Sequence, residues 1–211
     1  MEKSNLKKVA ITGGIATGKT TLLRLVKKMG FPTLSCDEVV KKLYEKQSVL
    51  EKLRKFLPEE VFTPEKKVNS RKLLSLILKD KTVKKRIEDL IHPEVKKEVV
   101  TFFKEAEKKG AKVLFVEVPL LFEVGWEHLF DEVWLITCSE ELQKKRIFER
   151  GEVGEFLMQL ASFQMPLKEK LKRLKSLKNY RIFSSEKPVL QLEKNLKSIL
   201  KEYLEDKFPL P

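Results

Sequence analysis

Residues 13–20 carry the spacing of a loop that binds phosphate groups. Gly13 and Gly18 are separated by four residues and followed by Lys19 and Thr20, which fits the pattern G-x-x-x-x-G-K-[ST]. Glycines bring backbone N–H groups close to oxyanions, the lysine reaches the terminal phosphates of a nucleoside triphosphate, and the threonine hydroxyl can ligate Mg²⁺. The alternative, without a binding function, is a glycine turn followed by a surface lysine. We expect nucleotide contacts from Gly14, Ile15, Ala16, Thr17, Gly18, Lys19, Thr20 and Thr21.

Two carboxylates from other segments can complete a site for phosphoryl transfer. Asp37 follows a predicted strand and can accept the proton of an attacking hydroxyl or contact Mg²⁺; the alternative is that it caps a helix beginning at Glu38. Glu117 ends an apolar run and can hold Mg²⁺ through a bound water, or it is a half-buried glutamate paired with a lysine. We therefore expect Thr20, Asp37 and Glu117 to be the metal-binding residues.

Two arginines and one histidine are further candidates. Arg146 and Arg150 are spaced i, i+4 on a predicted helix, so they share a face and can both point at phosphates, unless they are surface residues. His92 precedes Pro93 at a predicted helix interruption, where a histidine contacts substrate or only caps and packs. We interpret His128 as structural. Because no Cys/His cluster accompanies either histidine, neither a zinc site nor a Ser-His-Asp hydrolase is supported.

The residues around the glycine loop predict the strand and helix that hold it. Residues 9–11 are typical of a short buried strand, and apolar residues within 22–29 recur at the spacing of a helix with one buried face. Residues 31–35 predict a second strand. The helix covers about 18 Å and the strand returns about 16 Å, so Asp37 reaches the same sheet edge as the glycine loop.

The rest of the chain alternates strands and helices. In order, we predict three or four helices over 38–110, strands over 113–118 and 133–137, a polar helical stretch over 140–177, a strand over 180–184 and an amphipathic helix over 192–203. Such alternation predicts an α/β fold, a parallel sheet covered on both faces, with ligands at the carboxyl ends of the strands. The glycine loop, Asp37 and Glu117 all fall at that edge, which favours an enzyme.

The composition favours a soluble globular domain with a basic surface. The 211 residues carry a formal net charge of +13, from 44 lysines and arginines against 31 aspartates and glutamates. Positive residues are mixed with glutamates along the predicted helices, which is typical of solvated helix faces, and an electropositive cleft also suits a polyanionic substrate.

Compartment and partners are expectations from the same sequence. Apolar runs are too short to span a membrane, and two distant cysteines, Cys36 and Cys138, suit a reducing compartment. We expect a cytoplasmic protein that binds neither nucleic acid nor membrane. The sequence does not fix the oligomeric state, for which a monomer is the expectation.

Taken in order along the chain, these motifs resemble the dephospho-CoA kinase family. The resemblance rests on the glycine loop, Asp37, the His92-Pro93 pair, the Val-Pro-Leu-Leu-Phe-Glu segment at 118–123, Arg146 and Arg150, and Gln164-Met165-Pro166 followed by Lys170. It covers nearly the whole chain. The 118–123 segment and the His-Pro pair are far more specific than the glycine loop, which many kinases and GTPases share.

The resemblance implies an ATP- and Mg²⁺-dependent kinase that phosphorylates the ribose 3′-hydroxyl of dephospho-CoA, giving coenzyme A and ADP. It implies a P-loop kinase fold with three α/β/α layers and a five-stranded parallel sheet. The implied regions are a nucleotide-binding core (1–37, 112–138 and 178–211), a helical substrate domain (38–111) and a lid (139–177). The implied catalytic residues are Lys19, Asp37 and Arg150, with Arg146 on the nucleotide. The implied substrate contacts are Asp37, His92, Pro119, Leu120, Leu121 and Phe122.

Several positions depart from the family pattern. Ser35 stands where many members have an aspartate, and Ala16 replaces a frequent loop glycine. Gly151 follows Arg150 where aspartate is usual, and 182–184 is Ile-Phe-Ser where Ile-Asp-Asn usually leads into the adenine-contacting loop.

Two other functions are open to a chain with this glycine loop. A nucleoside monophosphate kinase would share the core, but the 118–123 segment argues against it. A nucleotide-dependent switch or a nucleic-acid-associated protein would fit the net charge of +13. A GTPase switch, however, should carry an Asn-Lys-x-Asp motif, and the sequence has none.

Overall fold

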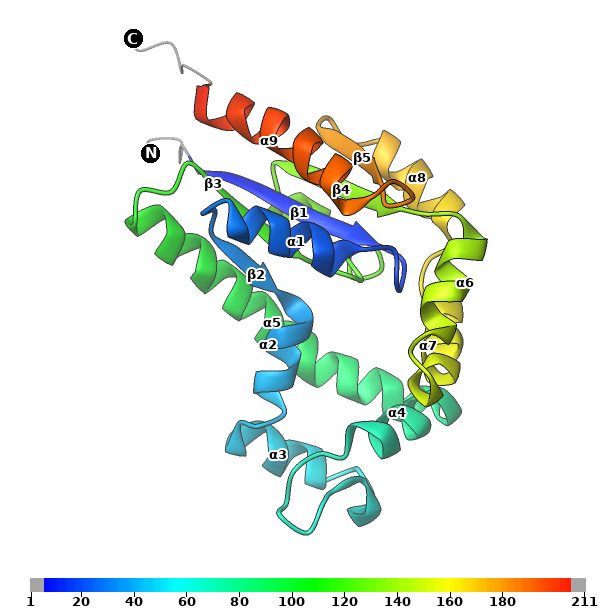
Figure 1. Ribbon diagram of the computed structural model, residues 1–211. Coiled ribbons are helices and arrows are strands. Elements are labelled where there is room, and N and C mark those ends of the chain that lie inside the picture. The colour runs from blue at the N-terminus through cyan, green and yellow to red at the C-terminus, as the bar shows by residue number, and fades with distance from the viewer. Residues whose placement is uncertain (1–5, 206–211) are drawn as a thin grey trace.

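The computed structural model describes residues 6–205, and five parallel strands form a single sheet in that range (Figure 1). The strands lie in the order β2-β3-β1-β4-β5. Their bounds are Lys7–Gly13 for β1, Thr33–Ser35 for β2, Val113–Glu117 for β3, Glu132–Thr137 for β4 and Tyr180–Ser184 for β5. The predicted α/β fold with a five-stranded parallel sheet is confirmed.

The strand register brings the predicted chemical groups to one edge. Ser35, which immediately precedes α2 (Cys36–Leu43), pairs with Glu117 at the end of β3, and Glu117 also pairs with Ile11 of β1. Gly13, the last residue of β1, pairs with Ile136 near the end of β4. The carboxyl ends of these strands therefore meet where the glycine loop begins.

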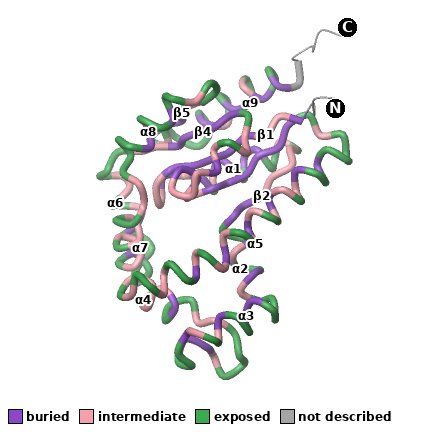
Figure 2. The backbone as a smooth tube through the Cα atoms, turned by 180° about the vertical axis from the view of Figure 1, so that it is seen from behind, coloured by how far each residue is buried: buried purple, intermediate pink, exposed green. Residues whose placement is uncertain are grey.

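Helices cover both faces of the sheet and form a three-layer arrangement. On one face α1 (Lys19–Lys28) and α9 (Val189–Glu205) pack their apolar residues against Val9, Ile11 and Trp134. On the other face α5 (Lys81–Lys108) and α8 (Leu167–Lys175) pack against Ala10 and Leu135. Buried residues are accordingly concentrated in the sheet and on the helix faces turned toward it (Figure 2).

The segment between β2 and β3 is helical, as predicted. It consists of α2, α3 (Gln47–Arg54), the short 3-10 helix η1 (Glu59–Val61), α4 (Ser70–Lys79) and the long α5. The predicted interruption at His92-Pro93 was wrong, because α5 runs through Pro93 without a break. A proline inside a helix costs about 3 kcal/mol, and the burial of Ile91, Val95 and Val99 on the inner face of α5 offsets this cost.

Three helices lie between β4 and β5 in the sequence. They are α6 (Glu140–Phe148), α7 (Glu152–Ser162) and α8, and a further 3-10 helix, η2 (Glu127–Leu129), precedes β4. Helix α7 contacts α4, so the segment after β4 reaches across to the helical segment that precedes β3 (Figure 1). The sheet edge, α5 and α7 thereby surround one space.

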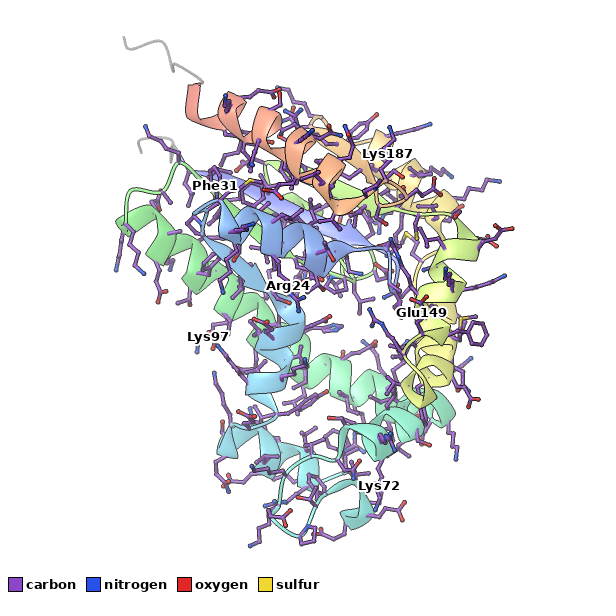
Figure 3. All side chains as sticks on the ribbon, viewed as in Figure 1. Arg24, Phe31, Lys72, Lys97, Glu149 and Lys187 are labelled. Atoms are coloured by element: carbon purple, nitrogen blue, oxygen red, sulfur yellow. The ribbon has the colours of Figure 1, made fainter. Side chains whose placement is uncertain are left out.

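Charged side chains cover the outer surface of the helices. Lys72 on α4 and Lys97 on α5 are exposed, whereas Glu149 lies beside that enclosed space (Figure 3). Cys36 and Cys138 are both free thiols. Across residues 6–205, the helices lack the combination of length and apolar character that crossing a bilayer would require.

Candidate active site

A cavity of about 1510 Å³ opens at the carboxyl edge of the sheet. It is lined by the glycine loop, the first turns of α1 and α2, one face of α5, the segment after β3, helices α6 and α7, and the loop at 185–189. This is large enough for a nucleotide together with a second substrate, because single-ligand pockets occupy about 300–1,000 Å³.

Two positions of the glycine loop require glycine. A Cβ atom on Gly13 would stand 2.3 Å from the carbonyl oxygen of Ile136, and Gly18 has a φ of +104° that side chains rarely adopt. Ala16 also lies in the left-handed region, with a φ of 59°. The carbonyl of Gly14 accepts hydrogen bonds from the Thr17 hydroxyl at 2.9 Å and from Lys19 Nζ at 2.7 Å.

Lys19 is a buried cation at the floor of the cavity. Its side chain lies at the start of α1 and the residue is 8% exposed. Burial lowers the pKa of Lys19 to about 8, and the positive charges of Lys170 and Arg150 act in the same direction against Glu117 and Asp37. A cation poised in this way is stabilised strongly by bound anions such as phosphates.

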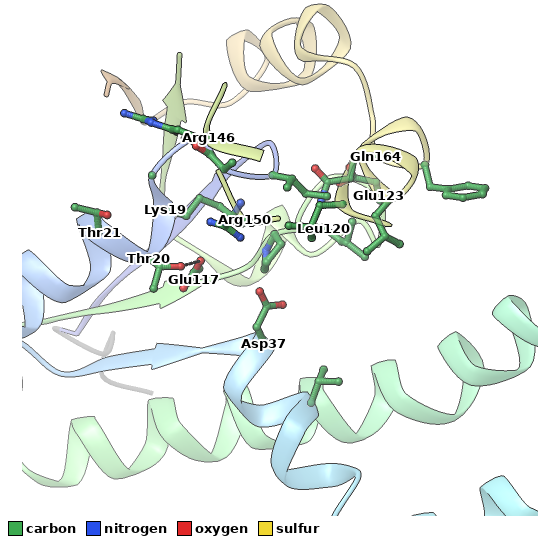
Figure 4. A pocket seen from close by; sticks show the side chains of 18 of the residues that line it. Lys19, Thr20, Thr21, Asp37, Glu117, Leu120, Glu123, Arg146, Arg150 and Gln164 are labelled. Carbon is green, nitrogen blue, oxygen red and sulfur yellow. Dashed lines mark hydrogen bonds between the residues drawn. The ribbon is translucent and has the colours of Figure 1, made fainter. Parts of the chain in front are cut away.

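Glu117 and Thr20 form a pair beside Lys19. The Thr20 hydroxyl donates a 3.0 Å hydrogen bond to Glu117 Oε1, while Glu117 Oε2 is buried with no hydrogen-bond partner among the described residues (Figure 4). Burial raises the pKa of Glu117, against the opposing charge of Lys19. Within 6–205 the structure contains no ion pair between Glu117 and a lysine, so the alternative interpretation of this residue was wrong.

Asp37 projects into the cavity from the first turn of α2. Its carboxylate points toward Glu117 and Arg150 (Figure 4). Ser35 occupies the N-cap position of α2, so the alternative in which Asp37 caps the helix was wrong. Asp37 is open to the cavity, but the surrounding protein excludes much of the water around it; this burial raises the pKa of Asp37 against the charges of Lys19 and Lys41.

The two predicted arginines both line the cavity but differ in their contacts. Arg146 on α6 donates to the Ser185 hydroxyl at 2.7 Å, to the Ser185 carbonyl at 2.8 Å and to the Ala16 carbonyl at 3.3 Å. It therefore ties the glycine loop to the segment after β5. Arg150 lies just beyond α6, next to Lys19 (Figure 4), and its guanidinium forms no hydrogen bond or ion pair within the described residues.

Comparison with known proteins identifies the family of this chain. A sequence model of the dephospho-CoA kinase family matches residues 7–181. The chain belongs to this family. A dephospho-CoA kinase from Nitrobacter winogradskyi is 36% identical over 169 residues, which cover 78% of this chain and 82% of that relative.

Solved structures agree on the fold. The crystal structure of TT1252 from Thermus thermophilus matches with a TM-score of 0.73 at 29% identity, covering 93% of this chain and 97% of that one. A dephospho-CoA kinase from Campylobacter jejuni matches with a TM-score of 0.63 at 23% identity, covering 94% of this chain and 98% of that one, and this similarity bears on the fold alone. As a member of the dephospho-CoA kinase family, the protein is a kinase.

The segment at 118–123, which carries much of the family resemblance, divides between cavity and core. Pro119 and Leu120 line the cavity. Leu121 and Phe122 do not: they are 0% and 1% exposed and pack in the hydrophobic core. The expected contact of these two residues with substrate is therefore corrected to support of the segment from behind.

His92 lines the cavity from α5. Its ring meets the ring of Trp126 edge-on, with centroids 6.3 Å apart. Burial lowers the pKa of His92, against the charges of Glu88 and Asp89, which favours the neutral imidazole. A neutral imidazole beside an indole suits packing or hydrogen bonding to a substrate better than ion pairing.

The remaining nucleotide-contact residues are less central. Ile15, Ala16, Gly18 and Thr21 line the cavity, with Thr21 at its rim (Figure 4). Gly14 and Thr17 lie in the same loop but outside the cavity lining, so any part they play is through the backbone of the loop.

Sequence reasoning missed two features of the site, one that supports the glycine loop and one that lines the cavity. Gln143 donates a 2.7 Å hydrogen bond to the Ile15 carbonyl, and its spacing from Arg146 and Arg150, at i, i+3 and i+7, could have identified it. Trp126 lines the cavity from a turn after β3, and no local pattern indicates that placement.

Proposed function

We propose that the chain transfers the γ-phosphoryl group of ATP to the ribose 3′-hydroxyl of dephospho-CoA, giving coenzyme A and ADP. The single observation that carries the proposal is the convergence of Lys19, Asp37 and Glu117 from α1, α2 and β3 at one end of one cavity (Figure 4). Membership of the dephospho-CoA kinase family supports the choice of acceptor.

Each residue in this cluster has a role that follows from its chemistry. The loop amides and Lys19 hold the β- and γ-phosphates, because a buried ammonium and backbone N–H groups both favour anions. Asp37 faces them from the opposite wall and orients the attacking hydroxyl, from which it accepts the proton. Arg150, whose guanidinium has no partner among the side chains that the structure describes, neutralises the charge of the transferred group.

The residues around Thr20 fit Mg²⁺. Glu117 Oε2 is a buried carboxylate oxygen without a partner in the described chain, and an orphaned oxygen of this kind beside a threonine hydroxyl is the donor set that Mg²⁺ prefers. We assign Thr20 as a direct ligand and place Glu117 and Asp37 on its bound waters. When bound, the ion neutralises phosphate charge.

Each of the three regions has its own role in the proposal. In the proposal residues 38–111 bind the acceptor, 139–177 act as a lid, and the remaining segments bind the nucleotide. The contact between α7 and α4 supports this division, because it brings the proposed lid against the proposed acceptor-binding region beside the cavity. In the proposal, closure of the lid excludes water that would otherwise hydrolyse ATP. We further propose a cytoplasmic location, supported by the two free thiols, and a monomer.

The direct test is incubation of the purified protein with Mg-ATP and dephospho-CoA, with the product followed by mass spectrometry. We expect coenzyme A and ADP in equal amounts, and none from a Lys19→Met variant that is folded by circular dichroism. Parallel reactions with nucleoside monophosphates as acceptors test the rival kinase class. Phosphorylation of those acceptors in place of dephospho-CoA would overturn the proposal.

A further inference from the structure

An ion pair joins a buried lysine to a half-buried glutamate that itself lines the cavity. Lys170 on α8 is 1% exposed, and its ammonium contacts Glu123 Oε1 at 2.9 Å and the Pro119 carbonyl at 3.4 Å. The reaction described above uses neither charged residue directly. A fully buried lysine is rare because removing an ammonium from water costs several kcal/mol.

Glu123 joins segments that lie far apart in the chain. The same Oε1 atom that meets Lys170 accepts a 2.8 Å hydrogen bond from the backbone N–H of Met165, in the connection between α7 and α8. Thr12, at the end of β1, donates to the Pro119 carbonyl at 3.5 Å. One carboxylate and one carbonyl thus fix the connection between α7 and α8, the segment after β3 and the strand that leads into the glycine loop.

Helix α8 holds this segment at a second point. Arg173, one turn beyond Lys170, donates to the Phe122 carbonyl and lies 3.5 Å from Glu127 Oε1. Residues spaced i, i+3 share a helix face. Leu174 on the same side of α8 is completely buried in the core. Helix α8 is therefore anchored to the core by charged and apolar contacts together.

The residues that these contacts hold in place line the cavity. Pro119 and Leu120 line the cavity, and Gln164, just beyond α7, lies near Leu120 (Figure 4). We propose that Lys170 and Glu123 are positioning residues, which set the Pro119–Leu120 wall and Gln164 at the separation that the acceptor substrate requires. The inference rests on the proposed function and adds two residues to it.

The small contribution that such an ion pair makes to folding stability supports a positioning role. Replacing a buried ion pair by apolar residues of similar volume is often neutral or stabilising, whereas removing one partner leaves an uncompensated charge. The pair is therefore a poor device for stability alone. Its charge-assisted hydrogen bonds have a defined geometry. The Pro119–Leu120 wall is part of a turn and has no regular strand or helix hydrogen bonds to fix its position, so these contacts can fix it instead.

The test uses Lys170→Met, Glu123→Gln and the double variant Lys170→Met/Glu123→Met, with Lys172→Met, an exposed lysine of the same helix, as the control. We expect the single variants to raise the KM for dephospho-CoA by about tenfold or more, within the roughly hundredfold that a 1 Å misplacement can cost. The KM for ATP should stay within about twofold, and Lys172→Met should match the unmodified enzyme.

The double variant separates positioning from stability. It leaves no unpaired charge, so its thermal midpoint should recover toward that of the unmodified enzyme while its KM for dephospho-CoA stays raised. A stable double variant with a normal KM for dephospho-CoA would overturn the inference. So would an equal rise in both KM values. If the unmodified enzyme makes no coenzyme A, the proposed function itself has failed, which is a distinct result.

Discussion

The Thr20 hydroxyl donates a 3.0 Å hydrogen bond to Glu117 across 97 positions of sequence, and this bond joins the first turn of α1 to the end of β3. It leaves the second carboxylate oxygen of Glu117 buried without a partner within the described residues. The helix that follows the glycine loop and strand β3 are thereby connected through two of the residues proposed to hold Mg²⁺.

Glu117→Gln should raise the Mg²⁺ concentration needed for half-maximal activity by about ten- to a hundredfold, the usual cost of losing a group that orients a metal ligand. The amide keeps the size of the side chain and loses the charge. Steady-state rates over a Mg²⁺ titration measure the effect. Glu132→Gln is the matched control, since Glu132 is another buried carboxylate, at the opposite end of the sheet. An unchanged Mg²⁺ requirement in Glu117→Gln would assign that residue to structure.

Asp37→Asn should lower kcat by at least about a hundredfold, the scale of a positioned proton acceptor, while ATP still binds. The acceptor hydroxyl loses the group that takes its proton, but the phosphate loop is untouched. Single-turnover rates and calorimetric binding of ATP separate the two effects. Glu38→Gln, at the exposed neighbouring position, serves as the control. Near-normal turnover of Asp37→Asn contradicts the assigned role.

Arg150→Met should lower kcat by about a hundredfold or more, because a cation that meets the transferred group acts mainly in the transition state. The KM for ATP should change less than for Arg146→Met, since Arg146 supports the glycine loop through Ala16. Arg24→Met, on the exposed side of α1 (Figure 3), should behave as the unmodified enzyme. A large rise in the KM for ATP with unchanged kcat would place Arg150 on the bound nucleotide only.

Much of this site could be predicted from sequence because its positions follow from periodicity. Strand, glycine loop and helix lengths bring Asp37 and Glu117 to one edge, and helical spacing brings Arg146 and Arg150 to one face. The orientation of side chains in turns does not follow from any period. Leu121 and Phe122 therefore pack inward where substrate contact was expected, and Trp126 lines the cavity without a signal.

Local rules also fail where tertiary packing is stronger. Pro93 predicted a helix interruption, yet burial along α5 keeps the helix continuous. Asp37 has the residue type of an N-cap, yet the end of β2 places Ser35 in that position. The Lys170–Glu123 pair joins residues 47 positions apart, and no local motif indicates such a contact.

Ala16→Gly should stabilise the protein by up to about 1 kcal/mol, because a non-glycine residue in the left-handed region costs about 1–2 kcal/mol and glycine loses part of that gain through its larger unfolded-state entropy. Gly13→Ala should have the opposite effect, since its Cβ would stand 2.3 Å from a backbone oxygen. Urea unfolding of both variants gives the comparison, and a destabilised Ala16→Gly variant contradicts the expectation.

The pH dependence of nucleotide binding should follow Lys19. Its pKa of about 8 applies to the free enzyme, so kcat/KM for ATP, which reports the free enzyme, should fall as the pH rises through about 8 and the ammonium loses its proton. Bound triphosphate stabilises the ammonium, so kcat should hold to higher pH. Toward acid, protonation of Asp37 should lower kcat/KM, at a pH above the usual range for aspartate because the pKa of Asp37 in the free enzyme is raised. Lys19→Arg keeps its charge at every pH tested. Its residual activity should therefore lack the alkaline fall, and an identical fall in that variant would assign the titration to another group.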